Sequence, residues 1–385
     1  MSQTEKIPFW RDSRILNIIA QVVILTMVIS IFIFFGNNLV NNFRRLGLTF
    51  GFNFLTRSAS FAIANPPFEY SPSDPYFKAI LVGLINSLKV MFFGIIIATI
   101  LGITVGLGRL SNNWLVRKLA TIYVETLRNT PLLLQLFFWY FAVFLRLPRI
   151  ENAFNISNTI FLSNRGMRIP WFVSNLQTIL SSILILTAII LAVLFWKKRV
   201  DTIEEMGESG QDWLNLLIAS LVITVATFFF GIDWNIPQYE GNSLAGGTNL
   251  SPEFATLLIG LSIYTASFIA EVVRAGIQSV NKGQWEAARA LGLEPGLVMQ
   301  LVIFPQALRV MIPPLTSEFL NLAKNSSLAI AIGYNDVYAI SNTISNQTGK
   351  AVEILLILVG IYLTINLIIS LAMNWLNKSV QLKER

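Results

Sequence analysis

The sequence has 385 residues but no cysteine and no histidine. Without cysteine there is no disulfide, no thiolate nucleophile and no cysteine-based zinc site. Without histidine there is no imidazole base, no histidine metal ligand and no Ser-His triad. Charge is also scarce, because 13% of the residues are charged, against about a quarter in soluble domains. These absences leave few catalytic groups, so we do not expect an enzyme.

Long apolar runs recur along the chain. They cover about 15–35, 90–108, 129–145, 177–196, 213–232, 254–270 and 354–373, and an eighth run at about 310–333 is interrupted by two prolines, a glutamate and a lysine. About 20 helical residues cross the roughly 30 Å hydrocarbon core of a bilayer. The sequence therefore predicts an all-α polytopic membrane protein with about eight transmembrane helices. The first run is too long for the apolar part of a cleavable signal peptide, so we expect it to be retained.

The net charge of +7 is distributed unevenly over the predicted loops. More Lys and Arg residues flank the spans on the side that is cytoplasmic if both chain ends lie inside the cell. Cationic loops are retained in the cytoplasm when membrane proteins insert. The charge bias thus predicts an N-in, C-in topology, and it accounts for the positive charge without a nucleic-acid partner.

Changes in composition divide the chain into four predicted regions. They are an N-terminal helix with an external segment (1–78), a first group of spans (79–145), an external loop with an inserted helix pair (146–252), and a last group of spans (253–385). Prolines make 65–76 extended or turn-like. The charged stretch 197–212 is expected to be a solvated linker within the inserted pair.

Two helical patterns concern packing. Residues 112–128 carry their charges on one arc of a helix, which is typical of a helix at the membrane interface or of the polar end of a longer span. Ala98, Gly102 and Gly106 recur every four residues and let helix backbones approach closely. We expect packing within the chain, with a dimer face as the alternative.

Polar residues also lie near the ends of predicted spans. Asn86, Ser87 and Lys89 are near the external end of the second span. They can line a vestibule, or Lys89 can simply extend to the lipid headgroups. Arg128 begins the third span and is expected to be an interfacial anchor rather than a ligand.

A short charged stretch, "NKGQWEAARALGLEP" at 281–295, separates the sixth and seventh spans on the predicted cytoplasmic side. Strong helix formers predict a two-turn helix that ends before Gly292 in a left-handed turn. Pro295 can then begin the next helix, where its missing N–H is not needed. The alanines give this helix a flat surface from which Trp285, Glu286 and Arg289 are expected to project. The alternative is a solvated loop without a partner.

The stretch "EAARALGLEPGLVMQLVIFP" resembles the EAA loop of ATP-binding-cassette importer permeases. The matching positions are Glu286, Ala287, Ala288, Gly292, Val302 and Pro305, with Phe304 in place of the usual leucine. The stretches at 128–141, 270–292 and 322–333 resemble permeases for polar amino acids. The extra first helix and the inserted pair are similar to the larger subgroup of general amino-acid permeases.

The resemblance implies a type I permease with a five-helix core, in the bacterial inner membrane, that forms half of the pathway of an ATP-driven amino-acid importer. The implied partners are an ATPase pair, a second permease that is identical or a paralogue, an external solute-binding protein and membrane lipid. The chain has no G-x-x-x-x-G-K-[ST] sequence, so ATP and Mg²⁺ belong to the partner ATPase. The implied coupling residues are Trp285, Glu286, Ala287, Ala288, Arg289 and Gly292.

Ionisable residues inside a span are costly and mark a pathway or a buried pair. The eighth run offers candidate substrate-binding residues, namely Glu318, Asn321, Lys324, Asn325 and Ser326. A carboxylate and an ammonium on this helix can meet the two charges of an amino acid. The alternatives are an ion pair between Glu318 and Lys324, a pair between Lys324 and Glu271, or a solvated helix end. The family often has Asp at Asn325, which bears on the preferred substrate charge.

A different class of function remains open at this point. Eight spans and an intramembrane Glu/Lys pair are also compatible with an ion-gradient-driven secondary transporter. That alternative leaves the EAA-like segment without a role.

Overall fold

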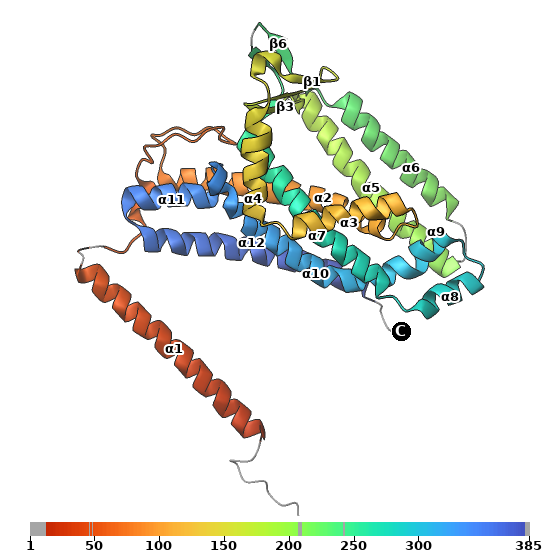
Figure 1. Ribbon diagram of the computed structural model, residues 1–385, viewed down its shortest axis with the longest axis horizontal. Helices are drawn as coiled ribbons and strands as arrows, with labels where there is room; N and C mark the ends of the chain where they lie inside the picture. Colours follow the sequence, from red (N-terminus) through yellow and green to blue (C-terminus); the bar gives the residue numbers. More distant parts are fainter. Residues whose placement is uncertain (1–12, 46, 48, 207–209, 242, 382–385) are drawn as a thin grey trace, which may run out of the picture.

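The computed structural model describes residues 13–45, 47, 49–206, 210–241 and 243–381. Its helices are α1 (Ser13–Arg45), α2 (Tyr76–Arg109), α3 (Trp114–Arg128), α4 (Leu132–Phe137), α5 (Leu176–Met206), α6 (Gln211–Ala226), α7 (Pro252–Gln278), α8 (Lys282–Ala290), α9 (Pro295–Leu297), α10 (Phe304–Asn325), α11 (Val337–Thr348) and α12 (Ala351–Val380). Figure 1 shows α2, α7, α10 and α12 as a bundle, with α5 and α6 as a separate pair.

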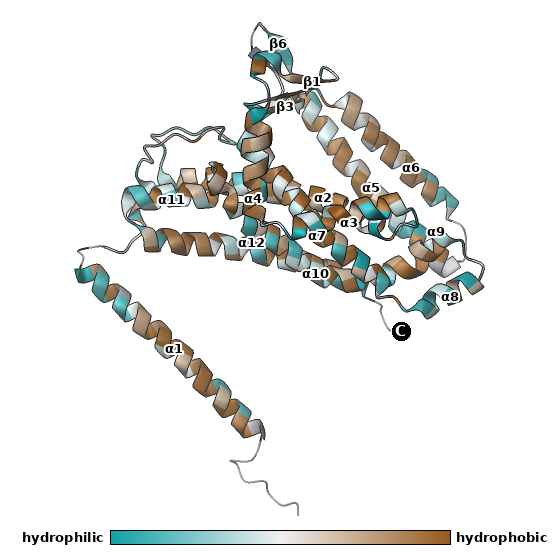
Figure 2. Ribbon diagram, viewed as in Figure 1, coloured by the Kyte–Doolittle hydropathy of each residue, from teal (hydrophilic) through white to brown (hydrophobic). Residues whose placement is uncertain are grey.

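Seven helical segments of the described chain are long and apolar enough to cross a membrane. They correspond to seven of the predicted spans, and the polytopic, predominantly α-helical class is confirmed. The predicted span at 129–145 is a shorter apolar helix, Leu132–Arg146, in which α4 continues as π and 3₁₀ turns. The brown colour of α1, α5 and α6 in Figure 2 marks their apolar sequences.

Two predicted boundaries were wrong. The helix α2 begins at Tyr76 rather than near 90, because its first turns are buried against the external segment and α11. The helix α5 extends to Met206, so most of the predicted solvated linker is helical, and 207–209 lie outside the described residues. The prediction that 65–76 is extended or turn-like is confirmed up to Pro75, where the chain consists of bends, turns and irregular segments and α2 then begins at Tyr76.

The small residues of α2 pack against α7 within the chain. A Cβ atom added at Gly102 would lie 2.5 Å from a side-chain carbon of Ile269, and one at Gly106 would lie 2.8 Å from Val273. Close backbone approach therefore requires glycine at both positions. The helix α3 also packs along α2 and α7 (Figure 1). It is a separate helix, divided from α2 by residues 110–113 and from α4 by residues 129–131, so the alternative of a polar end of a longer span does not hold.

The loops at one end of the bundle contain strands that the sequence analysis did not predict. They are β1 (Phe154–Ile156), β2 (Ile160–Ser163), β3 (Gly166–Ile169), β4 (Trp171–Phe172), β5 (Trp234–Asn235), β6 (Gln238–Glu240), β7 (Ser243–Ala245) and β8 (Thr248–Leu250). The largest sheet has the antiparallel order β1-β2-β3-β8. Pairing of β3 with β8 joins the loops that precede α5 and follow α6.

The two ends of the bundle are formed by different elements. The helix α8 and the end of α12 lie at one end, while α11 and the external segment lie at the other (Figure 1). The end with α8 is the predicted cytoplasmic end. The external segment has its own apolar core, in which Phe54 and Tyr76 are buried beside Val337 of α11.

Candidate functional site

The predicted two-turn helix at 281–295 is present as α8. The side chain of Asn281 caps it by accepting a hydrogen bond from the Gly283 N–H at 2.8 Å. Gly292 has a φ of +76°, the left-handed conformation expected at its end, and Pro295 is the first residue of α9. Gly292 is exposed, and nothing lies within 4 Å of the Cβ it lacks. The local stop and start signals were therefore correctly predicted.

The surface of α8 separates into an attached face and a free face. Ala288 is buried and Trp285 is partly buried against the bundle core, so Trp285 does not project as predicted. Glu286, Ala287 and Arg289 are exposed on the other side. Leu291, directly after α8, is 82% exposed and adds an apolar side chain to this free surface.

The attached face connects α8 to two long helices. The helix α7 leads into α8 through only three residues, and the Gln306 side chain of α10 donates a hydrogen bond to Gln284 at 3.2 Å. Trp285 and Ala288 pack with residues of α7, α10 and the turns between α9 and α10. A displacement of α8 would therefore move α7 and α10 with it.

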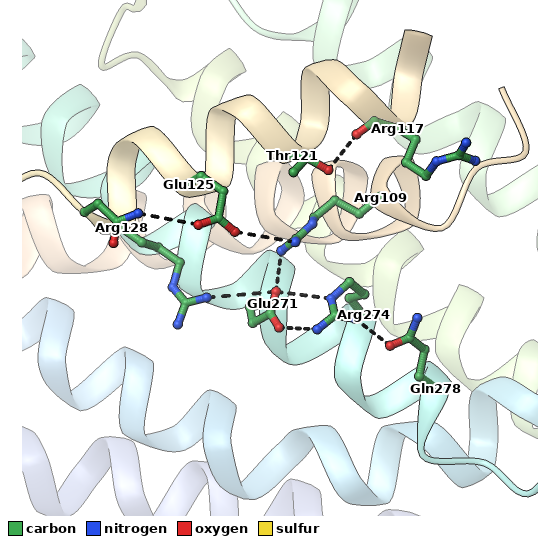
Figure 3. A network of polar contacts seen from close by, with 9 residues as sticks. Arg109, Arg117, Thr121, Glu125, Arg128, Glu271, Arg274 and Gln278 are labelled. Atoms are coloured by element: carbon green, nitrogen blue, oxygen red, sulfur yellow. Dashed lines mark hydrogen bonds and ion pairs between the residues drawn. The ribbon is translucent and has the colours of Figure 1, made fainter. Parts of the chain in front are cut away.

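A cluster of opposite charges joins α2, α3 and α7 beside this end (Figure 3). The carboxylate of Glu271 pairs with Arg109 and Arg274, and it lies 3.9 Å from a guanidinium nitrogen of Arg128. Glu125 of α3 lies 3.7 Å from Arg109. Only 12% of the Arg109 side chain is exposed. Removal of Glu271 would leave this guanidinium largely without a counter-charge in a poorly hydrated place.

This cluster was not predicted from the sequence. Glu271 was considered only as a partner for Lys324, and Arg128 only as an interfacial anchor. In the structure, Arg128 approaches Glu271, and its guanidinium carbon lies over the Phe268 ring, 5.1 Å from the ring centroid. The available signal was the presence of arginines at the ends of three apolar runs. Which carboxylate they meet depends on the packing of those runs.

The five candidate substrate-binding residues lie at the end of α10 and the following turn. Glu318 is partly buried, and Asn321 follows it three residues further along α10. Among the described residues, no ion pair within 4 Å joins Glu318 to Arg128. Asn321 and Lys324 are exposed, and Asn325 is partly buried. Ser326 is fully buried, and its hydroxyl donates to the Ala323 carbonyl at 2.8 Å. The structure thus places Glu318 and Asn321 as neighbours on one face of α10, whereas Arg128 pairs with Glu271.

The expected ion-pair alternatives do not form. Among the described residues, no ion pair joins Lys324 to Glu318 or to Glu271, whose carboxylate is already paired with arginines.

Near the outer end of α2, the Asn86 side chain donates a hydrogen bond to the Asn335 carbonyl at 2.9 Å. The Ser87 hydroxyl accepts from the Val337 N–H at 3.0 Å. These two residues hold α2 against the start of α11.

Comparison with known proteins relates this arrangement to one family. Residues 211–382 match the family described as "binding-protein-dependent transport system inner membrane component". The amino-acid ABC transporter permease protein YhdX of Escherichia coli is 43% identical over 95% of this chain and 94% of its own length. The chain belongs to the ABC transporter permeases.

Two further relatives extend over nearly all of this permease. The general L-amino acid transport system permease protein AapQ of Rhizobium johnstonii is 40% identical over 97% of this chain and 94% of its own length. The glutamate/glutamine/aspartate/asparagine transport system permease protein BztB of Rhodobacter capsulatus is 39% identical over 97% and 96%. The permease is a multi-pass protein of the inner membrane and not an enzyme, and ATP hydrolysis belongs to a separate subunit.

Proposed function

We propose that this permease imports polar or broad-range L-amino acids and forms half of the pathway together with a second permease chain, identical or paralogous. A pair of ATPases binds at α8 from the cytoplasm, carrying the ATP and Mg²⁺. An external solute-binding protein delivers the amino acid at the opposite end. Support comes from the three relatives named above, all of which are amino-acid permeases by name. The observation that carries the coupling role is the free face of α8 on a firmly attached helix.

The mechanism follows from the attachments of α8. Glu286, Arg289 and Leu291 offer the ATPase a charged and apolar knob. When the ATPases close on nucleotide, they pull α8, and the packed core passes the displacement to α7 and α10. Rigid-body motion of two such halves about the substrate site is sufficient for alternating access. The Glu271 cluster keeps α2 and α3 moving with α7.

The substrate role of α10 also belongs to this proposal. An amino acid presents an ammonium to Glu318 and a carboxylate to Lys324, and Asn321 and Asn325 supply neutral hydrogen bonds. The buried Ser326 hydroxyl already has a backbone acceptor, so we assign it a lesser role.

Reconstitution in liposomes tests the proposal. Uptake of labelled L-amino acids should require both permease chains and the ATPases. It should also require ATP on the side of the membrane that carries the ATPases and the loaded binding protein on the opposite side. Lys324→Met should lower the uptake of amino acids with a free carboxylate, while Lys378→Met, at the exposed end of α12, should not. Ion-gradient-driven uptake by the permease alone would establish the secondary transporter instead.

A further inference from the structure

A second place for a charged small molecule lies at the outer end of the bundle. A cavity of about 760 Å³ opens there, and its lining includes Lys89, Phe93, Trp171, Glu253, Phe254 and Tyr334. Small-molecule sites typically have volumes of about 300–1,000 Å³. The walls come from five places in the chain, namely α2, the external segment at 64–67, the strands β3, β4 and β8, the start of α7, and residues 333–335 before α11.

Lys89 and Glu253 are the two charged residues among those lining the cavity, and they have opposite signs. No ion pair within 4 Å joins either of them to another side chain in the described part of the chain. Glu253 is partly buried and is held by a hydrogen bond from the Tyr140 hydroxyl at 3.0 Å. An ionisable side chain on a membrane helix, such as Lys89 on α2, is costly and marks a functional site by default.

Aromatic side chains provide the rest of the environment. Phe254 and Tyr334 lie with their ring centroids 5.9 Å apart, and Phe93 and Trp171 face the same cavity. A lysine on α2 and a glutamate on α7 in one cavity match the carboxylate and the ammonium of a zwitterion, and aromatic rings accommodate side chains of different shapes. This set of groups suits free amino acids better than simple anions or cations, which would pair with only one of the two charges.

We propose that this cavity is an outer binding site for zwitterionic amino acids, in which Lys89 binds the carboxylate and Glu253 binds the ammonium. The inference rests on the proposed import of amino acids and adds a station before Glu318 and Lys324. Residues 333–335 of its lining are joined to α10, which carries Lys324, by the single 3₁₀ segment Ser326–Ile332. The lining combines core residues on α2 and α7 with the external segment at 64–67 and with Trp171.

The absence of cysteine allows a direct occupancy measurement. Thr248→Cys places a single thiol in the cavity wall, and Asn346→Cys places one on the exposed side of α11 outside it. The labelling rate with a methanethiosulfonate reagent is measured on the complete permease–ATPase complex in nanodiscs, without binding protein. With L-glutamine at about 10 mM and a dissociation constant of about 1 mM, labelling in the cavity should slow about tenfold, and labelling on α11 should not change.

Variants and analogues identify the chemistry of the site. Lys89→Met or Glu253→Gln should abolish the protection by glutamine, and Lys89→Arg should restore most of it. Glutamine with its α-carboxylate converted to an amide, or without its α-amino group, should protect poorly. Equal protection by these analogues, or protection unaffected by either variant, would overturn the proposal.

ATP-driven uptake by the same complex distinguishes a failure of the outer site from a failure of the proposed importer role. ATP-driven uptake of glutamine without any protection of the cavity thiol would overturn the outer site and leave the importer role intact. Protection without uptake would support the outer site while contradicting the importer role. If protection appeared only with the binding protein present, the cavity would be a docking place for that protein, and the amino-acid site would be wrong.

Discussion

The two ends of this permease are built in different ways. At the α8 end, one continuous stretch of sequence supplies the helix, its cap, its terminating glycine and the proline that follows. At the outer end, segments as distant as 64–67 and 333–335 meet around one cavity. The first arrangement can be recognised from neighbouring residues, whereas the second exists only after the chain has folded.

The largest expected effect concerns the free face of α8. Glu286→Lys reverses an exposed charge at the proposed ATPase contact and should reduce the affinity for the ATPase at least about tenfold, without affecting membrane insertion. Co-purification from membranes measures the association. Glu240→Lys, an exposed glutamate on β6 at the outer end, is the matched control. Equal ATPase recovery for both variants would remove Glu286 from the contact.

A second change tests whether the charge cluster ties the helices together behind α8. Glu271→Gln leaves Arg109 and Arg274 without their main counter-charge, so the Tm of the purified permease should fall by roughly 5–10 °C. Glu125→Gln should have little effect, because that side chain is 58% exposed and exposed ion pairs contribute little. Thermal denaturation in detergent measures both. A larger loss for Glu125→Gln would mean that Glu271 is not the centre of the cluster.

At the outer end, the pairing of β3 with β8 forms part of the cavity wall. Gly166 has a φ of +113°, and a Cβ there would overlap the Leu250 carbonyl. Gly166→Ala should therefore lower the Tm by roughly 3–6 °C. Gly241 also has a positive φ, but nothing lies within 4 Å of a Cβ added there. Gly241→Ala therefore measures the cost of backbone strain without a steric overlap. Identical losses would show that the contact with Leu250 is unimportant.

The smallest expected effect is a pH dependence at the start of α11. Burial raises the pKa of the Asp336 carboxyl to about 7, above its unfolded value of about 4. Ionisation of Asp336 therefore destabilises the fold as pH rises through this range, and the penalty is absent below about pH 4 and complete above about pH 7. Between pH 5 and 8, the wild type should lose roughly 1–3 °C of Tm relative to Asp336→Asn, which retains an oxygen to cap Ala339. Parallel Tm curves for the two proteins would contradict this account.

The sequence predicted most of the helical framework and part of the site. Seven apolar segments became helices long enough to span a membrane, and Gly292 and Pro295 bound α8 as expected, because these features depend on neighbouring residues. Burial of Trp285 was not predictable, since it depends on how α8 lies against the bundle. The partners of Glu271 and the β3–β8 pairing join residues far apart in sequence, and no local pattern specifies them.

The central claim is that force from a separate ATPase enters this chain through α8. The cysteine-free sequence allows Glu286→Cys to carry a benzophenone probe at a single site, and illumination of the assembled importer then records what touches α8. The account predicts a covalent adduct with the ATPase, and none from the same probe at Glu240→Cys on the outer sheet. Adducts with lipid alone at position 286, while the ATPase is bound and active, would contradict it.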